Sequence, residues 1–458
     1  MTDVLKNIFI SIIMIPIIIF KLIRKGMKKI PGLLYSRNII NYFLIYWIIA
    51  FLFYLYGPIK YPKFNIMNVV VLFIIYIFST KIGSFFGQMI NIKKNHTLHF
   101  YKYSTWKLLI TIGLIIGIIL SILTVLTRSS FTSFNQIFNN LLLGLSDPSQ
   151  GYLKNLSSEY EGGAITQLAT VFSPLVHMSF VLALFFWEKL KAAQKWLTVL
   201  YIIVEAGQYI IKGTNFGLFK VAIILVTVLL VNKNVRLATY RRKKSFVVRF
   251  APLIIAFVIF YFFFSISSRM SYQAIPTTIF NLPIDQNNFF IKNLPSGLSI
   301  PLLLGISYLS QGFYGFQLAT TYDFTTTYGF GSGRFLLSFP ERLFGLDLWD
   351  RTFQNKMDAV WDSRINWHTA FTWIANDISF FGVIVYLLII GFLFILVFND
   401  VKKNQNPLAV VLLPLYVIMF VFIPLNNVVF DNPLLFMPFI TFNFIWMVDK
   451  IYFKEISD

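Results

Sequence analysis

Polar side chains interrupt an apolar run in the stretch NWHTAFTWIANDISFFG, residues 366–382. If this stretch is one helix, four of its polar residues share a face: His368, Thr372, Asn376 and Ser379. The stripe would be about 16 Å long, half the hydrocarbon thickness of a bilayer, with Asp377 one step beside it. Ionisable groups at membrane depth are energetically expensive, so we expect the stripe to line a water-filled cavity, with His368 and Asp377 as candidate acid–base groups. A polar contact between packed helices is the alternative.

Two arginines precede this stretch in GFGSGRFLLSFPERLFG, residues 329–345. Guanidinium forks match the geometry of phosphate oxygens, and the flexible GSG before Arg334 lets backbone amides approach an anion. Arg342 follows Arg334 by eight residues, about two helical turns, so a helix can place both on one face. We expect them to bind an anion. The alternatives are interfacial anchors on an amphipathic helix, or an ion pair with the adjacent Glu341.

Charged residues within apolar runs add a further candidate. Glu205 and Lys220 lie on either side of the turn KGTNFG. Lys220 is about two turns inside its run, so we expect it to bind a phosphate or carboxylate, or to pair with Glu205. The stretch YLSQGFYGFQLA, residues 308–319, combines aromatic rings with glycines. That pattern suits sugar stacking, and it suits a membrane-interface belt equally well.

Composition restricts the other site types. The chain has no cysteine, which excludes disulfides, thiolate-ligated zinc and iron–sulfur clusters. Its four histidines are scattered, so we expect no histidine-ligated metal and no cofactor: His96, His99, His177 and His368. The net charge of +20 comes from basic residues in short loops between apolar runs. That placement is a topology signal and argues against nucleic acid as a partner.

The elements that carry these residues are predicted to be membrane helices. Hydrophobic residues make up 57% of the 458-residue chain and charged residues 13%, about half the share of a soluble domain. Apolar runs recur, while the alternating strands of an outer-membrane barrel are absent. The sequence therefore predicts an all-α integral membrane protein, a polytopic helical bundle. We expect ten transmembrane helices, at 39–56, 67–84, 108–127, 165–187, 196–211, 216–232, 249–266, 372–398, 408–425 and 432–448.

These spans define four regions. Residues 1–38 contain a short run at 7–20, interrupted by Pro16 and followed by basic residues, and no signal-peptide cleavage site is evident. We interpret 7–20 as an interfacial basic helix, with an eleventh span as the alternative. Residues 39–266 hold seven spans, 267–371 form one large external loop with amphipathic helices, and 372–458 hold three spans and a short tail.

Loop charge predicts the orientation. Basic residues concentrate in 21–38, 85–107, 233–249 and 399–407, which fall on one side of the ten-span arrangement. The positive-inside rule makes that side cytoplasmic. We therefore expect a multi-pass protein of the cytoplasmic membrane with both termini inside and the loop 267–371 outside.

Three stretches together resemble the ordered signatures of Wzy-type polymerases, which join oligosaccharide repeat units in O-antigen, capsule and exopolysaccharide pathways: YLSQGFYGFQLA, TTYGFGSGRFLL and WHTAFTWIANDISFFG. The turn KGTNFGLFK is similar to a further element of the family. The likeness covers roughly 200–385 by motif and the whole chain by topology. Arg334 and Gly345, with ten residues between them, match a family spacing. The family's histidine–glycine spacing of nine is not matched, because thirteen residues separate His368 from Gly382.

The resemblance implies a metal-independent glycosyltransferase without a cofactor. Its substrate would be an undecaprenyl-pyrophosphate-linked oligosaccharide, and its other partners would be the lipid bilayer, a chain-length regulator and a flippase. A sugar hydroxyl would attack the anomeric carbon of the growing chain, and undecaprenyl pyrophosphate would leave. His368 or Asp377 would accept the proton, and the choice between them is open.

The same resemblance implies roles for the remaining candidate residues. Arg334 and Arg342 would bind pyrophosphate, with Arg364 as a third candidate and Lys220 as a further anion ligand. Tyr314, Gln311 and Asn376 would orient the sugar or the headgroup. A ligase that transfers finished polymer to another acceptor is one alternative. A lipid-linked oligosaccharide flippase, another transporter and a structural scaffold are the others.

Overall fold

The computed structural model describes residues 36–90, 92, 102–129, 134–157, 163–237, 246–270, 275–293 and 296–455. These parts of the chain are mostly helical, with a short two-stranded hairpin. The predicted interfacial helix at 7–20 lies outside the described residues, and so do parts of the basic segments 21–38, 85–107 and 233–249.

Long apolar helices confirm the predicted class of all-α, multi-pass membrane protein. Within the described residues, six helices are long and apolar enough to cross a bilayer. They are α2 (Ser36–Tyr56), α3 (Ile66–Met89), α4 (Tyr103–Ser129), α7 (Ala164–Phe185), α15 (Ala370–Asn404) and α18 (Pro433–Glu455). These six match six of the ten predicted spans.

The other four predicted spans are also helical but less suited to crossing. They are α8 (Ala192–Ile211), α9 (Phe216–Leu237), α10 (Phe246–Met270) and α16 (Pro407–Phe422). The last three carry shorter apolar stretches, for example Ala256–Ser268 in α10. A span needs about 20 apolar residues, so the count of ten stays a prediction.

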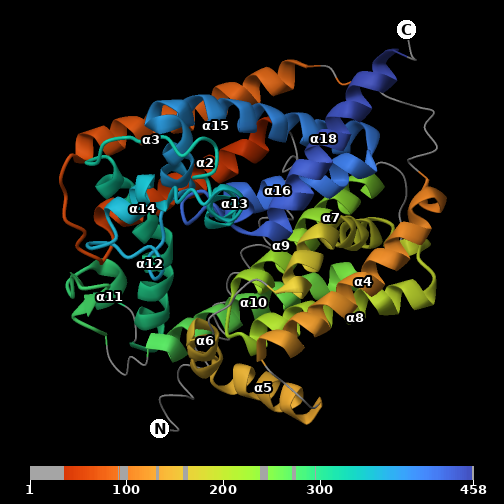
Figure 1. Ribbon diagram of the computed structural model, residues 1–458, viewed down its shortest axis with the longest axis horizontal. Helices are drawn as coiled ribbons and strands as arrows, with labels where there is room; N and C mark the ends of the chain where they lie inside the picture. Colours follow the sequence, from red (N-terminus) through yellow and green to blue (C-terminus); the bar gives the residue numbers. More distant parts are fainter. Residues whose placement is uncertain are drawn as a thin grey trace.

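Two groups of helices face each other across the molecule. In Figure 1, α2, α3 and α15 lie together along one side, α4 and α8 lie along the opposite side, and α9 and α16 run between them. Helices α3 and α15 approach closely because Gly83 has no side chain. A Cβ added there would lie 1.9 Å from the carbonyl oxygen of Leu388. Small residues at such contacts let membrane helices pack backbone to backbone.

The segment 267–371 contains more regular structure than an external loop requires. It holds β1 (Thr278–Ile279), β2 (Leu282–Pro283), α11 (Phe289–Lys292), α12 (Ser296–Ala319), α13 (Arg334–Phe344), the 3-10 turn η3 (Trp349–Arg351) and α14 (Phe353–Lys356). Helix α12 packs against α2 and α10 with Phe313 and Phe316 fully buried, so this part belongs to the bundle. The external position of the segment as a whole stays a prediction.

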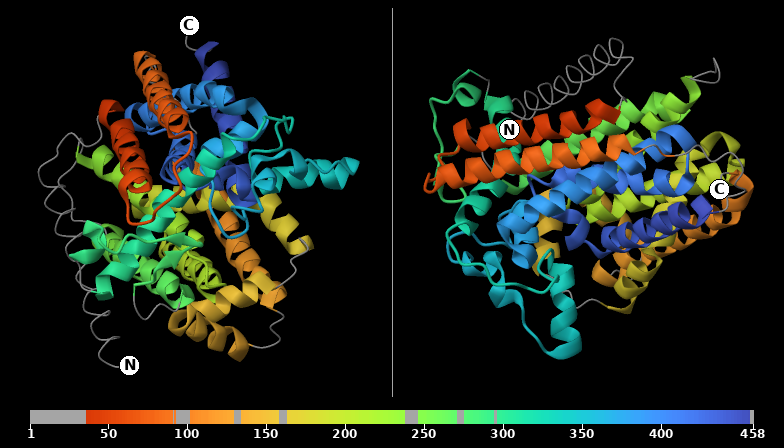
Figure 2. Two further views of the ribbon diagram at one scale, coloured as in Figure 1. Left: turned by 90° about the vertical axis from the view of Figure 1, so that its left-hand side faces the viewer. Right: turned by 90° about the horizontal axis from the view of Figure 1, so that it is seen from above.

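Short elements complete the arrangement: η2 (Trp187–Lys189), α5 (Phe134–Ser146), α6 (Pro148–Ser157) and α17 (Val428–Asp431). The connection 57–65 pairs with the hairpin, where Ile59 bridges Ile284. We call the end of the bundle that carries 57–65 and 320–369 the loop end. Figure 2 shows α13, in cyan, projecting from the body of the molecule.

Candidate functional site

The loop 326–332 is fastened to α15 by Asp377. One carboxylate oxygen of Asp377 accepts from the backbone N–H of Gly329 at 2.9 Å and of Gly331 at 2.8 Å, and from the Thr327 hydroxyl. The other oxygen accepts from the Ser332 hydroxyl at 2.6 Å. Both oxygens are therefore committed to the loop. We call this set of contacts, together with those of Asn376, the loop clip.

Asn376 completes the loop clip from a fully buried position. Its amide nitrogen donates to the Gly331 carbonyl at 2.9 Å and to Gln354 at 2.8 Å, and its oxygen accepts from the Phe353 N–H at 2.9 Å. Gly331 is required here, because a Cβ added to it would lie 2.6 Å from the Cβ of Asn376. The amide of Asn376 thus ties two segments of the chain to α15.

The expected helical stripe is wrong at both ends. Helix α15 begins at Ala370, so His368 precedes it, and the helix breaks at Ser379 with φ 62° and ψ 170°. A non-glycine residue in that region is strained and persists only where surrounding contacts hold it. The Tyr76 hydroxyl donates to the carbonyl of Phe380 at 2.8 Å, which satisfies one group at the break. Asn376 and Asp377 bind the segment 326–332 and the start of α14, and the expected water-filled cavity beside them stays a prediction.

Arg334 is the first residue of α13 and directly follows the GSG. Its backbone N–H donates to a carboxylate oxygen of Asp431 at 2.9 Å, and its guanidinium donates to the Ser363 hydroxyl at 2.9 Å. The guanidinium also lies over the Trp349 ring, 5.4 Å from the centroid. Arg334 is exposed while held on three sides, so its charge is available at a fixed place.

His368 is buried beside Arg334 with uncommitted nitrogens. The side chain is 1% exposed, and neither ring nitrogen has a hydrogen-bond partner in the described structure. Its ring lies edge-on to Trp373, and a Cβ added to Gly315 of α12 would lie 2.8 Å from Nδ1. Burial, with a smaller contribution from the charge of Arg334, lowers the pKa of His368 to about 3. The imidazole is therefore neutral at pH 7, and its unprotonated nitrogen can accept a hydrogen bond.

The other predicted residues of the loop end are spread around this centre. Arg364 forms an exposed ion pair with Asp362 at 2.8 Å, and the hydrogen bond from Arg364 lowers the pKa of Asp362. Arg342 is exposed near the far end of α13, about 12 Å along the axis from Arg334. Gln311 accepts from the Trp367 N–H at 3.3 Å. Tyr314 packs against Trp361, with the ring centroids 4.9 Å apart.

A cavity of about 430 Å³ lies inside the bundle. Helices α4, α7, α8 and α9 and the start of α18 line it, with hydroxyl, amide and charged groups beside aliphatic ones. We call it the bundle cavity. Its volume falls in the range of small-molecule binding sites. Among the residues that the structure describes, no group of three or more His, Asp or Glu side chains could hold a metal ion.

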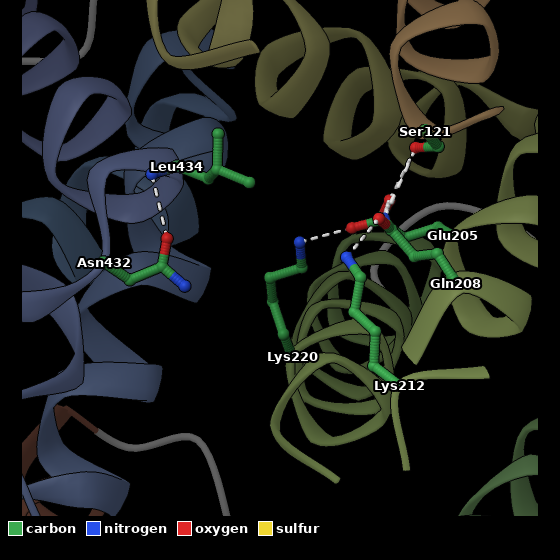
Figure 3. Close-up of polar contacts among 7 residues, drawn as sticks. All are labelled: Ser121, Glu205, Gln208, Lys212, Lys220, Asn432 and Leu434. Atoms are coloured by element: carbon green, nitrogen blue, oxygen red, sulfur yellow. Dashed lines mark hydrogen bonds and ion pairs between the residues drawn. The ribbon is translucent and has the colours of Figure 1, made fainter. Parts of the chain in front are cut away.

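Lys220 and Glu205 meet in the wall of the bundle cavity. The Lys220 ammonium donates to a carboxylate oxygen of Glu205 at 2.5 Å, as the pairing alternative predicted. The other Glu205 oxygen accepts from the Ser121 hydroxyl at 2.9 Å and from Gln208. Lys212 donates to the side-chain oxygen of Gln208 at 3.2 Å (Figure 3). The five side chains form one hydrogen-bonded cluster with two positive charges and one negative charge.

Asp431 connects the bundle cavity with Arg334. It lines the cavity, and it also accepts the hydrogen bond from the Arg334 N–H. Burial raises the pKa of Asp431. In Figure 3 the side chain of the next residue, Asn432, lies across the cavity from Lys220 and Lys212. The contact through Asp431 therefore links the start of α13 to the wall of the bundle cavity.

Sequence reasoning did not identify Asp431 as a site residue. It occurs in NNVVFDNPLLF, where an acid before a proline reads as the ordinary start of a helix. Its contact with Arg334 joins positions 97 apart in the chain. The sequence feature that could have marked Asp431 as a site residue is its position directly before an apolar run.

Comparison with known proteins does not assign this arrangement. No protein-family model matches the chain, and neither a curated protein nor a solved structure matches it.

Proposed function

We propose that this protein polymerises oligosaccharide repeat units carried on undecaprenyl pyrophosphate, at the outer face of the cytoplasmic membrane. The observation that supports the proposal most is the link through Asp431. It joins an arginine with a fixed, exposed guanidinium to a bundle cavity that contains two lysines. A lipid-linked anion with a bulky polar headgroup has the chemistry to use both.

The proposed reaction is a single displacement. The hydroxyl oxygen of one unit forms a bond to the anomeric carbon of the growing chain, while the bond from that carbon to the pyrophosphate oxygen breaks. The bonding pair leaves with undecaprenyl pyrophosphate, and the hydroxyl proton passes to a base. Pyrophosphate is already a good leaving group, so the main tasks are to stabilise its charge and to position the acceptor.

Arg334 is our candidate for the leaving group. Its fork can hold two phosphate oxygens, and its attachment to Asp431, Ser363 and Trp349 reduces the reorganisation needed on binding. Arg342 lies at the opposite end of α13, and Arg364 is engaged with Asp362, so both are secondary candidates. Lys212 and Lys220 would face the headgroup within the bundle cavity.

His368 is our preferred base, because its nitrogens are uncommitted whereas both oxygens of Asp377 hold the loop clip. Because pyrophosphate departs readily, removal of the proton from the acceptor need not limit the rate. The ring is enclosed by Gly315 and Trp373, so the proposal requires the loop end to open when the acceptor binds. A catalytic role for Asp377 stays the alternative.

A flippase is the second candidate. The bundle cavity carries a buried ion pair between helices, which is a feature of membrane transport pathways as well as of enzyme sites. A ligase shares the proposed chemistry and differs in its acceptor.

Analysis of lipid-linked units in a deletion strain separates these functions. A polymerase predicts that single units accumulate on the outer face and that long polymer is lost. Units trapped inside would instead indicate a flippase, and lipid-linked polymer of normal length would indicate a ligase. Expression of Arg334→Lys in that strain should give about 100-fold less polymer, the effect of removing one oxyanion donor, at normal protein level. Arg342→Lys is the matched control on the same helix and should retain most activity.

A further inference from the structure

Helix α13 presents an apolar face that the protein covers over only part of its length. Leu336 and Leu337, near the start of the helix, are 8% and 7% exposed. Leu343 and Phe344 follow them by seven residues and therefore lie on the same face, rotated by only about 20°. These two are 68% and 70% exposed. The same face thus passes from buried to uncovered as the helix leaves the body (Figure 2).

The uncovered part is a coherent surface. Phe339 lies on the same face and is 38% exposed, and Leu346, just beyond the end of the helix, is 55% exposed. The charged residues Glu341 and Arg342 lie on the other side of the helix, since Glu341 is about 160° from Leu343 around the axis. Large exposed apolar patches on proteins mark contacts with a partner or a membrane.

Ring contacts join this surface to a membrane-spanning helix. Phe339 packs on Phe335, with centroids 5.0 Å apart, and Phe335 packs on Phe436 of α18 at 5.8 Å. Phe436 begins a stripe on α18 that continues at Ile440 and Phe444, which are 46% and 69% exposed. Residues spaced by four share one face of a helix, and exposed apolar residues on a span face lipid.

We propose that α13 is an in-plane anchor whose apolar face lies in the interfacial layer of the bilayer next to α18. Because the apolar face of α13 continues into the stripe on α18, lipid covers this face and not a second copy of the chain. Arg342, on the opposite side of the helix, places its charge among headgroup phosphates. Because Arg334 is the first residue of α13, the anchor fixes Arg334 at headgroup depth, where a lipid-linked anion would arrive. This inference does not depend on the proposed activity.

The absence of cysteine makes the test direct. Leu343→Cys and Glu341→Cys place an environment-sensitive fluorophore on opposite faces of the same helix in the full-length protein. The labelled proteins are reconstituted in nanodiscs, with or without nitroxide-bearing lipids, and titrated with iodide. We expect several-fold stronger lipid quenching and several-fold weaker iodide quenching at position 343 than at position 341.

Two results would overturn the anchor. Equal iodide quenching at both positions would mean that the apolar face is in water. Protection from iodide at position 343 without quenching by lipid nitroxides would mean that protein covers the face, as in a dimer. Phe344→Cys repeats the measurement one residue further along the same face, so a folding defect in one variant leaves the test intact.

Discussion

We expect the substitution Asp377→Asn to loosen the loop clip, and the size of this effect can be worked out from the contacts of the carboxylate. The amide oxygen of asparagine can keep the three donors now on one carboxylate oxygen: the N–H groups of Gly329 and Gly331 and the Thr327 hydroxyl. The Ser332 hydroxyl can rotate to accept from the new NH2 group. The substitution removes the negative charge, and this loss weakens each of these three hydrogen bonds by about 1 kcal/mol. The sum of about 3 kcal/mol corresponds to roughly 100-fold more frequent opening of the loop.

Hydrogen exchange measures this opening at the atoms concerned. The backbone N–H groups of Gly329 and Gly331 both donate to Asp377, so their exchange should accelerate by about two orders of magnitude in Asp377→Asn. Amides in α12 serve as the internal control and should keep their protection. Unchanged exchange at both glycines, together with complete loss of polymerisation, would refute the clip and support Asp377 as the base.

Three further predictions concern the ion pair, the histidine and the helix contact. Lys220→Met should destabilise the protein by about 3–5 kcal/mol because it leaves the Glu205 charge buried and unpaired. Adding Glu205→Gln should recover much of this loss. Additive losses of stability in thermal unfolding would contradict a coupled pair. His368 has a folded pKa of about 3 against about 6.5 unfolded, so its contribution to stability is complete above pH 6.5 and is lost as the pH falls toward 3. Between pH 6.5 and 4.5 the parent protein should therefore lose up to about 2–3 kcal/mol of unfolding free energy that His368→Gln does not lose. Identical pH profiles of stability for both proteins would argue against a buried neutral imidazole. Gly83→Val should separate α3 from α15 and lower the melting temperature, whereas Gly207→Ala, where a Cβ finds open space apart from a contact at 3.8 Å, should have little effect.

The helical framework could be predicted because a membrane helix is recognisable from a local run of apolar residues. Long apolar runs locate α2 and α4, and helices also form at the shorter runs such as α16. The pairing of Lys220 with Glu205 could be anticipated because two opposite charges in neighbouring apolar runs have few other ways to be stabilised. Amphipathic helices were expected within 267–371, and α13 is one of them.

The remainder depends on tertiary contacts that no local pattern encodes. Nothing in Ile378-Ser379-Phe380 suggests a break, because neither glycine nor proline is present; the break exists because the loop clip holds the first part of α15 while α3 packs against the rest. Asn376 and the neighbouring Asp377 were therefore assigned to a cavity, whereas their side chains bind a loop some 50 residues earlier in the chain. Asp431 acquires its role only when α17 meets α13.

The central claim is tested most directly by reconstituting the purified chain with a synthetic undecaprenyl-pyrophosphate-linked repeat unit. The products would be resolved by length while released undecaprenyl pyrophosphate is quantified. Our account predicts lipid-linked glycans of two or more units, one undecaprenyl pyrophosphate released for each new linkage, and about 100-fold less of both with Arg334→Lys. Single units that stay unextended by a folded, lipid-embedded protein, or linkages formed equally well by Arg334→Lys, would contradict it.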